Sequence, residues 1–356
     1  MNGNGGRITF FACCYCCVCC VLLSVAMGAS GGAEDTSEQM IDMSAENATA
    51  TSAAVSCLGG VAAFASLASG HGSVWVRNET TATFHRSTDI PAGAVSVSCD
   101  GRAVYGGNAT ASSLYTSSGG GYRLAQTWPH PADLVSAACS RRAVAFADSG
   151  QGKLFFYAPP GAGGGSTALR RVFSGFRNAS SLSLSCDGSL LAVGVRETGT
   201  VTVLRTSDGS EFVQLRDEPD TGFGASVALA GPQRAPVLAV GCPALSTVRV
   251  YECGTDGTCG GLDYVEQPGV PDFGSSVSMN GNAALLVAAG RRDAFTLRWD
   301  VNKRRYMIAR ETSKLRALAV VSTRKGNAFA LAGQVDEHGA AFVMHTDTFA
   351  VNCPEC

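Results

Sequence analysis

The chain has 356 residues, which is enough for one large domain or two ordinary ones. Its 27 basic and 29 acidic residues nearly cancel, and this balance argues against a dedicated nucleic-acid-binding protein. Charged residues make up only 16% of the chain, whereas glycine is abundant at 43 residues. Such a composition is typical of many short strands joined by tight turns.

The amino terminus has the features of a targeting signal. Arg7 precedes a long apolar run over residues 8–28. Small residues near the end of this run fit the pattern read by signal peptidase, and cleavage is expected after Gly28 or Ser30. The run is also close to the length that spans a bilayer. Residues 1–30 are therefore predicted to be a signal peptide. The alternatives are an uncleaved signal anchor and a cytosolic chain that merely resembles an exported one.

The next segment, residues 31–53, is rich in serine, threonine and alanine and has no basic residue. Its acidic residues are Glu34, Asp35, Glu38, Asp42 and Glu46. Low hydrophobicity combined with charge of one sign predicts a disordered segment.

Four Asn-X-Ser/Thr sequons support entry into the secretory pathway, because this motif is the acceptor for N-glycosylation. They begin at Asn47, Asn78, Asn108 and Asn178. No second apolar run is long enough to span a membrane, so contact with a membrane is expected only through an uncleaved signal segment.

A short alternating segment recurs along the rest of the chain. Its copies are 72–76, 112–116, 152–156, 199–203, 246–250, 293–297 and 339–343, and successive copies are 40, 40, 47, 47, 47 and 46 residues apart. A continuous apolar segment precedes most copies, and before that lies a segment of small residues that often ends in Asp-Gly or Asn-Gly. A polar segment follows each copy.

This period, with four strands in each repeat, is typical of a β-propeller blade. We therefore predict an all-β fold: a single domain over residues 54–356 that forms a seven-bladed β-propeller of four-stranded antiparallel blades. Six or eight blades, a solenoid and a β-sandwich are the alternatives.

A family resemblance is visible over residues 181–300. Phe223-Gly224 and Phe273-Gly274 each precede a small-residue strand and then an apolar strand, and Pro243 follows the first of these apolar strands. The pattern resembles FG-GAP repeats, the blades of integrin α-chain heads. The resemblance implies an extracellular propeller that contacts a ligand or partner. The loops that hold calcium in many such blades lack carboxylates here, so no metal or other cofactor is expected.

Nine cysteines follow the signal segment, and an oxidising compartment would pair most of them. A disulfide is expected between Cys253 and Cys259, which flank a short turn, and a structural bridge is expected from Cys353 and Cys356, either local or back to the first blade. Four more cysteines end the innermost strands of successive blades, where they either join neighbouring blades or remain small buried thiols; they are Cys57, Cys99, Cys139 and Cys186. Cys242 is expected to be the buried unpaired thiol.

No catalytic signature is present. The five histidines are scattered without metal-ligand spacing, and no nucleophile elbow or phosphate loop occurs. We therefore predict no catalytic residues and no metal site.

One stretch of the chain is strongly basic. It contains Arg291, Arg292, Lys303, Arg304 and Arg305, with few acidic residues between them. A concentrated positive patch attracts anionic ligands such as sulfated or sialylated glycans. The competing interpretations are an ordinary solvated surface and neutralisation by the acidic segment.

The leading prediction is a secreted or cell-surface binding or adhesion module that engages an extracellular protein or an anionic glycan through propeller loops. The first alternative is a glycan-active hydrolase or lyase with its site at the central funnel. The second is a structural glycoprotein of a surface coat. The predicted inner strands consist mostly of small residues and supply few acid–base groups, which disfavours the enzyme.

Overall fold

The computed structural model describes residues 38–42, 50–138, 143–158, 167–231, 235–313, 316–322, 328–335 and 338–345. All of them belong to one compact unit, Glu34–Cys356. Within these residues the only helical elements are three short 3-10 turns, η2 (Arg196–Thr198), η3 (Pro219–Thr221) and η4 (Pro243–Leu245). No helix in the described part of the chain has the length and apolarity needed to cross a membrane.

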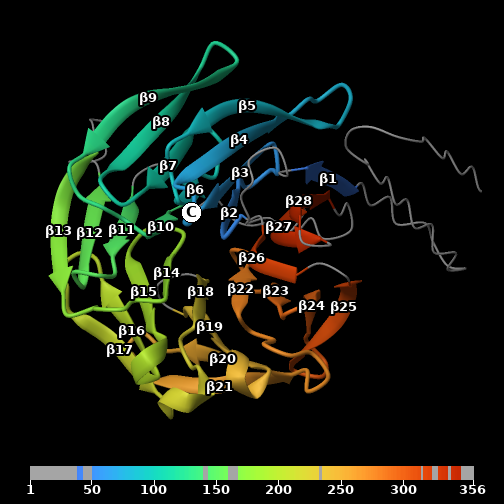
Figure 1. The fold of residues 1–356 in the computed structure, drawn as a ribbon. Coiled ribbons are helices and arrows are strands. Elements are labelled where there is room, and N and C mark those ends of the chain that lie inside the picture. Colours follow the sequence, from blue (N-terminus) through green and yellow to red (C-terminus); the bar gives the residue numbers. More distant parts are fainter. Residues whose placement is uncertain are drawn as a thin grey trace, which may run out of the picture. The chain divides into compact units, whose positions relative to one another are not determined.

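Six blades are each built from four consecutive antiparallel strands, ordered from the axis outwards (Figure 1). Blade I contains β2 (Ser52–Val55), β3 (Val61–Ser66), β4 (His71–Arg77) and β5 (Phe84–Ile90). Blade II contains β6 (Ala94–Val97), β7 (Ala103–Gly107), β8 (Ser112–Ser118) and β9 (Gly121–Trp128). Blade III contains β10 (Leu134–Ala137), β11 (Val144–Asp148), β12 (Lys153–Ala158) and β13 (Ala168–Ser174).

The next three blades repeat the same plan. Blade IV contains β14 (Ser181–Leu184), β15 (Leu190–Val195), β16 (Thr200–Arg205) and β17 (Glu211–Arg216). Blade V contains β18 (Ser226–Ala230), β19 (Val237–Cys242), β20 (Thr247–Cys253) and β21 (Cys259–Glu266). Blade VI contains β22 (Ser276–Met279), β23 (Leu285–Ala289), β24 (Asp293–Asp300) and β25 (Arg305–Ser313).

A further sheet, the closing sheet, joins the two ends of the described chain. It contains β26 (Arg316–Ser322), β27 (Ala328–Val335) and β28 (His338–His345), and its outermost strand is β1 (Glu38–Asp42). β1 pairs antiparallel with β28, with Glu38 opposite Met344 and Asp42 opposite Ala340. The inner strand β26 contacts both β22 and β2, so the circle of inner strands closes and forms a β-propeller.

The closing sheet corrects the predicted number of blades and includes a strand from the amino-terminal segment. We expected seven equivalent blades, each made from one continuous stretch beginning at residue 54. The structure has six such blades, and the sheet that completes the circle is a composite of both ends of the chain. The segment 31–53 was expected to be disordered, yet five of its residues form β1. Pairing with β28 supplies the ladder hydrogen bonds that a solvated segment of this composition would lack.

The position of each strand within a blade follows from its side chains. The second strand is buried on both faces between neighbouring blades, as in β23, where all five residues are buried. This environment explains its continuous apolar sequence. The fourth strand is outermost and mostly solvated, as in β13, where Phe173 is the only fully buried residue.

The core therefore lies between blades. Between blades IV and V, for example, Leu190, Val201, Phe223, Leu238 and Val240 pack in one buried cluster. Each interface of this kind removes apolar surface from water and fixes the angle between neighbouring sheets.

A repeated turn connects the first and second strands. The buried side-chain oxygen of Ser98, Ser185 or Asn280 accepts a hydrogen bond from the backbone N–H five residues later, at 2.8–2.9 Å. In the first two turns the serine hydroxyl also donates to an aspartate, Asp100 or Asp187. The turn thus satisfies backbone groups that would otherwise be buried without a partner.

Every one of the six continuous blades has a register shift between its third and fourth strands. Such a β-bulge twists the outer strand and weakens it as a template for another chain. The outer edges of these six blades are therefore poorer templates for edge-to-edge pairing.

Candidate functional site

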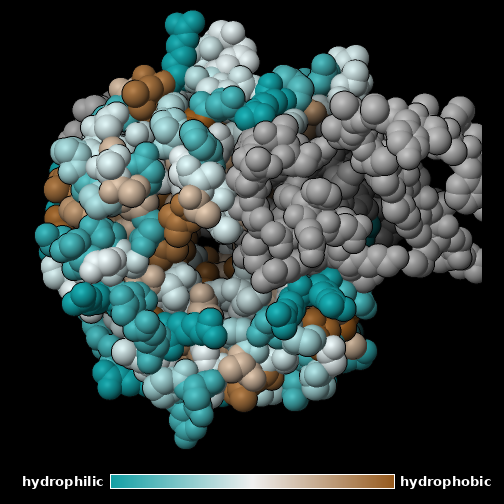
Figure 2. All heavy atoms as spheres, in the orientation of Figure 1, coloured by the Kyte–Doolittle hydropathy of each residue, from teal (hydrophilic) through white to brown (hydrophobic). Residues whose placement is uncertain are grey.

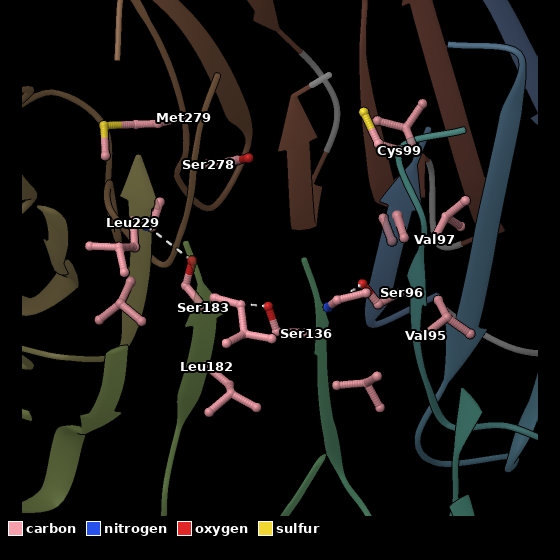
Figure 3. Close-up of a pocket in the computed structure, with 18 of the residues that line it drawn as sticks. Val95, Ser96, Val97, Cys99, Ser136, Leu182, Ser183, Leu229, Ser278 and Met279 are labelled. Atoms are coloured by element: carbon pink, nitrogen blue, oxygen red, sulfur yellow. Dashed lines mark hydrogen bonds between the residues drawn. The ribbon is translucent and has the colours of Figure 1, made fainter. Parts of the chain in front are cut away.

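A pocket lies on the propeller axis, where the inner strands of blades I–VI meet (Figure 3). Its volume is about 230 Å³. The lining side chains come from alanine, valine, leucine, serine, cysteine and methionine. Small residues are required at this position because the inner strands converge here.

Three serines in the pocket join adjacent inner strands. The hydroxyl of Ser96 accepts a hydrogen bond from the backbone N–H of Ala137 at 3.0 Å. Ser136 and Ser183 repeat this contact with the next blades, at 2.9 and 3.0 Å (Figure 3). These hydroxyls therefore stabilise the packing of the blades, and their role is accounted for without a ligand.

The chemistry of the pocket does not suit acid–base catalysis. Among the described residues that line it, the only titratable type is cysteine, and both examples, Cys57 and Cys99, are joined in a disulfide. Hydrolysis or elimination on a glycan needs a positioned acid and base. The described lining offers neither group to a hydrolase or lyase reaction at the central funnel.

The cysteines of the inner strands connect blades. Cys57 in blade I bonds to Cys99 in blade II, with a Cα separation of 4.5 Å, and Cys186 is also disulfide-bonded. Cys139 lies outside the described residues. Of the two interpretations left open by the sequence, the structure favours bridges between blades for Cys57 and Cys99.

Two further predictions about cysteine fall within the described residues. Cys253 and Cys259 are bonded across the turn between β20 and β21, with Cα atoms 4.0 Å apart. Cys242 is a free buried thiol, and desolvation raises its pKa to about 11, so the unreactive thiol form is favoured. Cys353 and Cys356 lie outside the described residues.

The basic residues singled out in the sequence fall into two groups at opposite ends of β24. Lys303, Arg304 and Arg305 are in or next to the β24–β25 turn, and all three are exposed. Arg291 and Arg292 are exposed in the turn before β24. The strand between them has eight residues, which corresponds to about 26 Å. The five residues therefore lie in two groups, one at each end of this strand.

The β24–β25 turn has a defined conformation. Asp300 Oδ1 accepts hydrogen bonds from the backbone N–H groups of Asn302 and Lys303, at 2.9 and 3.1 Å. Arg304 has a left-handed backbone, with φ of 52°. Asp300 also lies 3.8 Å from Lys303 Nζ, which is a weak exposed ion pair. The turn thus displays positive charge on a fixed backbone.

Three of the four sequons fall within the described residues. Asn78 and Asn178 are exposed, and Asn108 is half-buried. All three lie in connections between strands, and Asn47 is outside the described residues.

The sequence did not indicate two polar clusters that the structure assembles. His130 is buried between Ser112 and Tyr157, with Nε2 2.8 Å from the Tyr157 hydroxyl, and its ring stacks on Phe155. Arg249 pairs with Asp217 at 2.7 Å in a half-buried site. Both clusters join residues from separate parts of the sequence, so no local motif could have revealed them. Within the described residues no group of His, Cys, Asp and Glu could hold a metal ion.

The exposed face shown in Figure 2 is largely polar, with apolar residues scattered over it. The exposed large hydrophobic side chains come from several blades, for example Leu58, Leu124, Leu169, Tyr264 and Val301. Scattered apolar residues of this kind are normal on a protein surface and do not define a binding site.

Comparison with known proteins identifies a fold but no family. No family model and no curated protein match this sequence. By structure, 1246 chains of solved proteins are similar to it. One is the β-propeller domain of Cps50 (Swd1) from Myceliophteria thermophila, with a TM-score of 0.63 and 11% sequence identity over 86% of this chain and 98% of that chain. The chain is a β-propeller. At this identity the likeness concerns the fold alone.

Proposed function

We propose that this propeller is an exported binding module that engages an anionic extracellular ligand, such as a sulfated glycan, through the β24–β25 turn. The observation that carries the proposal is the exposed trio Lys303, Arg304 and Arg305 on one structured turn. Three adjacent positive charges raise the local concentration of an anionic ligand. Because the backbone is already held by Asp300, little conformational entropy is lost when a ligand binds.

The disulfides support export. One disulfide, Cys57–Cys99, joins cysteines 42 residues apart. A second disulfide joins Cys253 to Cys259, and Cys186 is also disulfide-bonded. Stable disulfides form mainly in the secretory pathway and outside the cell. The apolar run at residues 8–28 supplies a targeting signal for that route.

The FG-GAP resemblance remains part of the proposal. Phe223 and Phe273 are fully buried, and each precedes a glycine with positive φ, 84° at Gly224 and 91° at Gly274. The motif thus has a structural reason in both blades: the aromatic ring fills the core and the glycine turns the chain. An extracellular contact function, as the resemblance implies, agrees with the binding role proposed here.

The proposal is tested by binding of the purified full chain to an array of sulfated and non-sulfated glycans. The test variant is the triple substitution Lys303→Ser, Arg304→Asn and Arg305→Ser, in which asparagine tolerates the left-handed backbone. The control is Arg291→Ser with Arg292→Ser, which removes two charges at the other end of β24. We expect the triple variant to lose about tenfold or more in affinity, and the control to change little.

Salt provides a second measurement. Binding through exposed charges weakens as ionic strength rises, because screening shortens the range of the interaction. Absence of binding to sulfated glycans, binding that ignores salt, or equal loss in both variants would each contradict the proposed function.

A further inference from the structure

The sequons differ in what their asparagine side chains do in the folded protein. N-glycosylation replaces a hydrogen on Nδ2 with a bulky sugar, so an acceptor in the folded state needs space and freedom at that atom. The contacts of Asn78, Asn108 and Asn178 can therefore be compared directly.

Asn78 begins the turn between β4 and β5, at the outer side of blade I (Figure 1). Every residue from 78 to 83 is exposed. The side-chain oxygen of Asn78 accepts hydrogen bonds from the backbone N–H groups of Thr80 and Thr81, at 2.8 and 3.2 Å. Among the described residues Nδ2 has no hydrogen-bond partner. The oxygen fixes the turn, and the nitrogen is left without a partner in a turn whose residues are all exposed.

Asn108 has the opposite arrangement. It is half-buried, and its Nδ2 donates to the carbonyl oxygen of Pro91 at 2.7 Å, which links blade II to the end of blade I. Its Oδ1 accepts from the backbone of Thr110 and Ala111 and from the Thr110 hydroxyl, each at 2.9 Å. A glycosylated nitrogen would keep only one hydrogen, so a sugar there would crowd the contact with Pro91 in this half-buried site. Asn108 therefore serves as a structural residue.

Asn178 lies between these extremes. It is exposed, but its Nδ2 donates to Glu197 Oε2 at 2.6 Å. A glycan there would weaken a charge-assisted hydrogen bond between the loop before β14 and η2.

From these contacts we infer that Asn78 is the N-glycan carrier among the described sequons and that Asn108 acts as a structural cross-link between blades I and II that remains unmodified in the folded protein. This inference rests on export, which is part of the proposed function. The oligosaccharide is added before folding is complete, so a glycan on Asn108 would hinder folding and be depleted from the folded, secreted fraction.

The experiment measures site occupancy on secreted full chain by enzymatic deglycosylation in heavy-oxygen water followed by peptide mapping. The chain is produced twice in a eukaryotic secretory host, once with its own amino terminus and once behind a heterologous cleavable leader. The second form enters the secretory pathway regardless of residues 1–30, which separates failure of export from failure of the glycosylation inference.

The expected result is a glycan on Asn78 in most molecules and none on Asn108. Thr80→Ala should remove the glycan on Asn78 while leaving its contact with the backbone in place, and should leave the melting temperature of the enzymatically deglycosylated chain unchanged. Asn108→Gln should lower that temperature, because it breaks the contact with Pro91, without changing the glycan mass. An unmodified Asn78 in the leader-driven chain, or a glycosylated Asn108 in folded protein, would overturn the inference.

Discussion

The hydroxyl of Ser226 donates a hydrogen bond of 2.7 Å to the carbonyl oxygen of Gly274, 48 residues further along the chain and at the entrance to the next blade. The same contact recurs one blade earlier, where Ser181 donates to the carbonyl oxygen of Gly224 at 2.9 Å. In both cases the glycine follows a buried phenylalanine. The Phe-Gly loop therefore connects blade to blade through its backbone as well as through its aromatic ring.

The backbone conformation and close surroundings of Gly274 predict the effect of Gly274→Ala. The φ of 91° at Gly274 is unfavourable for any residue with a Cβ, and that atom would collide with the backbone oxygen of Thr247. The left-handed conformation alone costs about 1–2 kcal/mol, and the collision adds to it. We expect urea denaturation to show a loss of about 2 kcal/mol or more in the free energy of unfolding.

Gly269→Ala is the matched control, because Gly269 has no neighbour within 4 Å of an added Cβ. Its free energy of unfolding should stay within about 0.5 kcal/mol of that of the parent chain. Equal effects of the two substitutions would show that the Phe-Gly loop does not hold the blades together.

The disulfides should differ in their contributions to stability. In the chain-entropy account, a bond stabilises the fold by restricting the unfolded chain, and the effect grows with the length of the closed loop. Cys57–Cys99 joins residues 42 positions apart, and Cys253–Cys259 joins residues six apart. Replacing the first pair by alanine should cost about 4 kcal/mol and replacing the second about 2 kcal/mol, measured by chemical denaturation. A larger loss from the short-loop pair would contradict this account.

Much of the fold could be predicted because its information is local. The repeated positions of Val74, Val201 and Val248 reflect a strand that must pack in the same way in each blade. Residues at the ends of the innermost strands, such as Cys57 and Cys99, could be recognised as equivalent from the same period. The period predicted which residues were equivalent, but it did not decide between a bridge and two thiols, since that depends on the distance between neighbouring inner strands.

Two features of the structure depend on contacts that are not local in sequence. The pairing of Met40 with Phe342 joins opposite ends of the chain, and nothing in the composition of residues 31–53 indicates it. The basic residues from Arg291 to Arg305 are close in sequence, but β24 extends between the two groups and separates them. Proximity in sequence alone therefore does not bring the two basic groups together.

His130 predicts a loss of stability in mild acid. Burial lowers the pKa of its imidazole below the ordinary value of 6.5, against smaller opposing effects from the backbone of Pro131 and from Asp148. The unfolded chain then binds a proton more readily than the folded protein does. The contribution to stability is complete above pH 6.5 and declines as the pH falls through this value towards the lower folded pKa.

The measurement is thermal unfolding between pH 7.5 and pH 5 for the parent chain and for His130→Gln. The variant should be less stable at pH 7.5, because Tyr157 and Ser112 lose the imidazole as a partner. It should also lose less stability on acidification. His85→Gln is the control, since His85 is exposed on β5. Parallel pH profiles for the parent chain and His130→Gln would rule out His130 as the group responsible.

The closing sheet predicts that β1 keeps the propeller monomeric. β1 covers the outer edge of β28 through five paired residues, from Glu38–Met344 to Asp42–Ala340. Without it, the backbone groups of β28 would present an unpaired edge, which is a template for a strand from another chain. A chain lacking residues 1–42 should therefore unfold at lower temperature and form dimers or larger species as its concentration rises.

A chain beginning at residue 34 is the matched control, because it loses the amino-terminal segment but retains β1. Sedimentation velocity over a range of concentrations compares the two, and a peptide with the sequence of residues 38–42 and its flanks should restore the monomer when added in excess. The restoration distinguishes a vacant edge from general misfolding, since a misfolded chain would offer no register for the peptide. Identical sedimentation of the two chains would mean that the β1–β28 pairing contributes little to keeping the propeller closed and monomeric. The contact between the inner strands β26 and β2 would then be what closes the ring of blades.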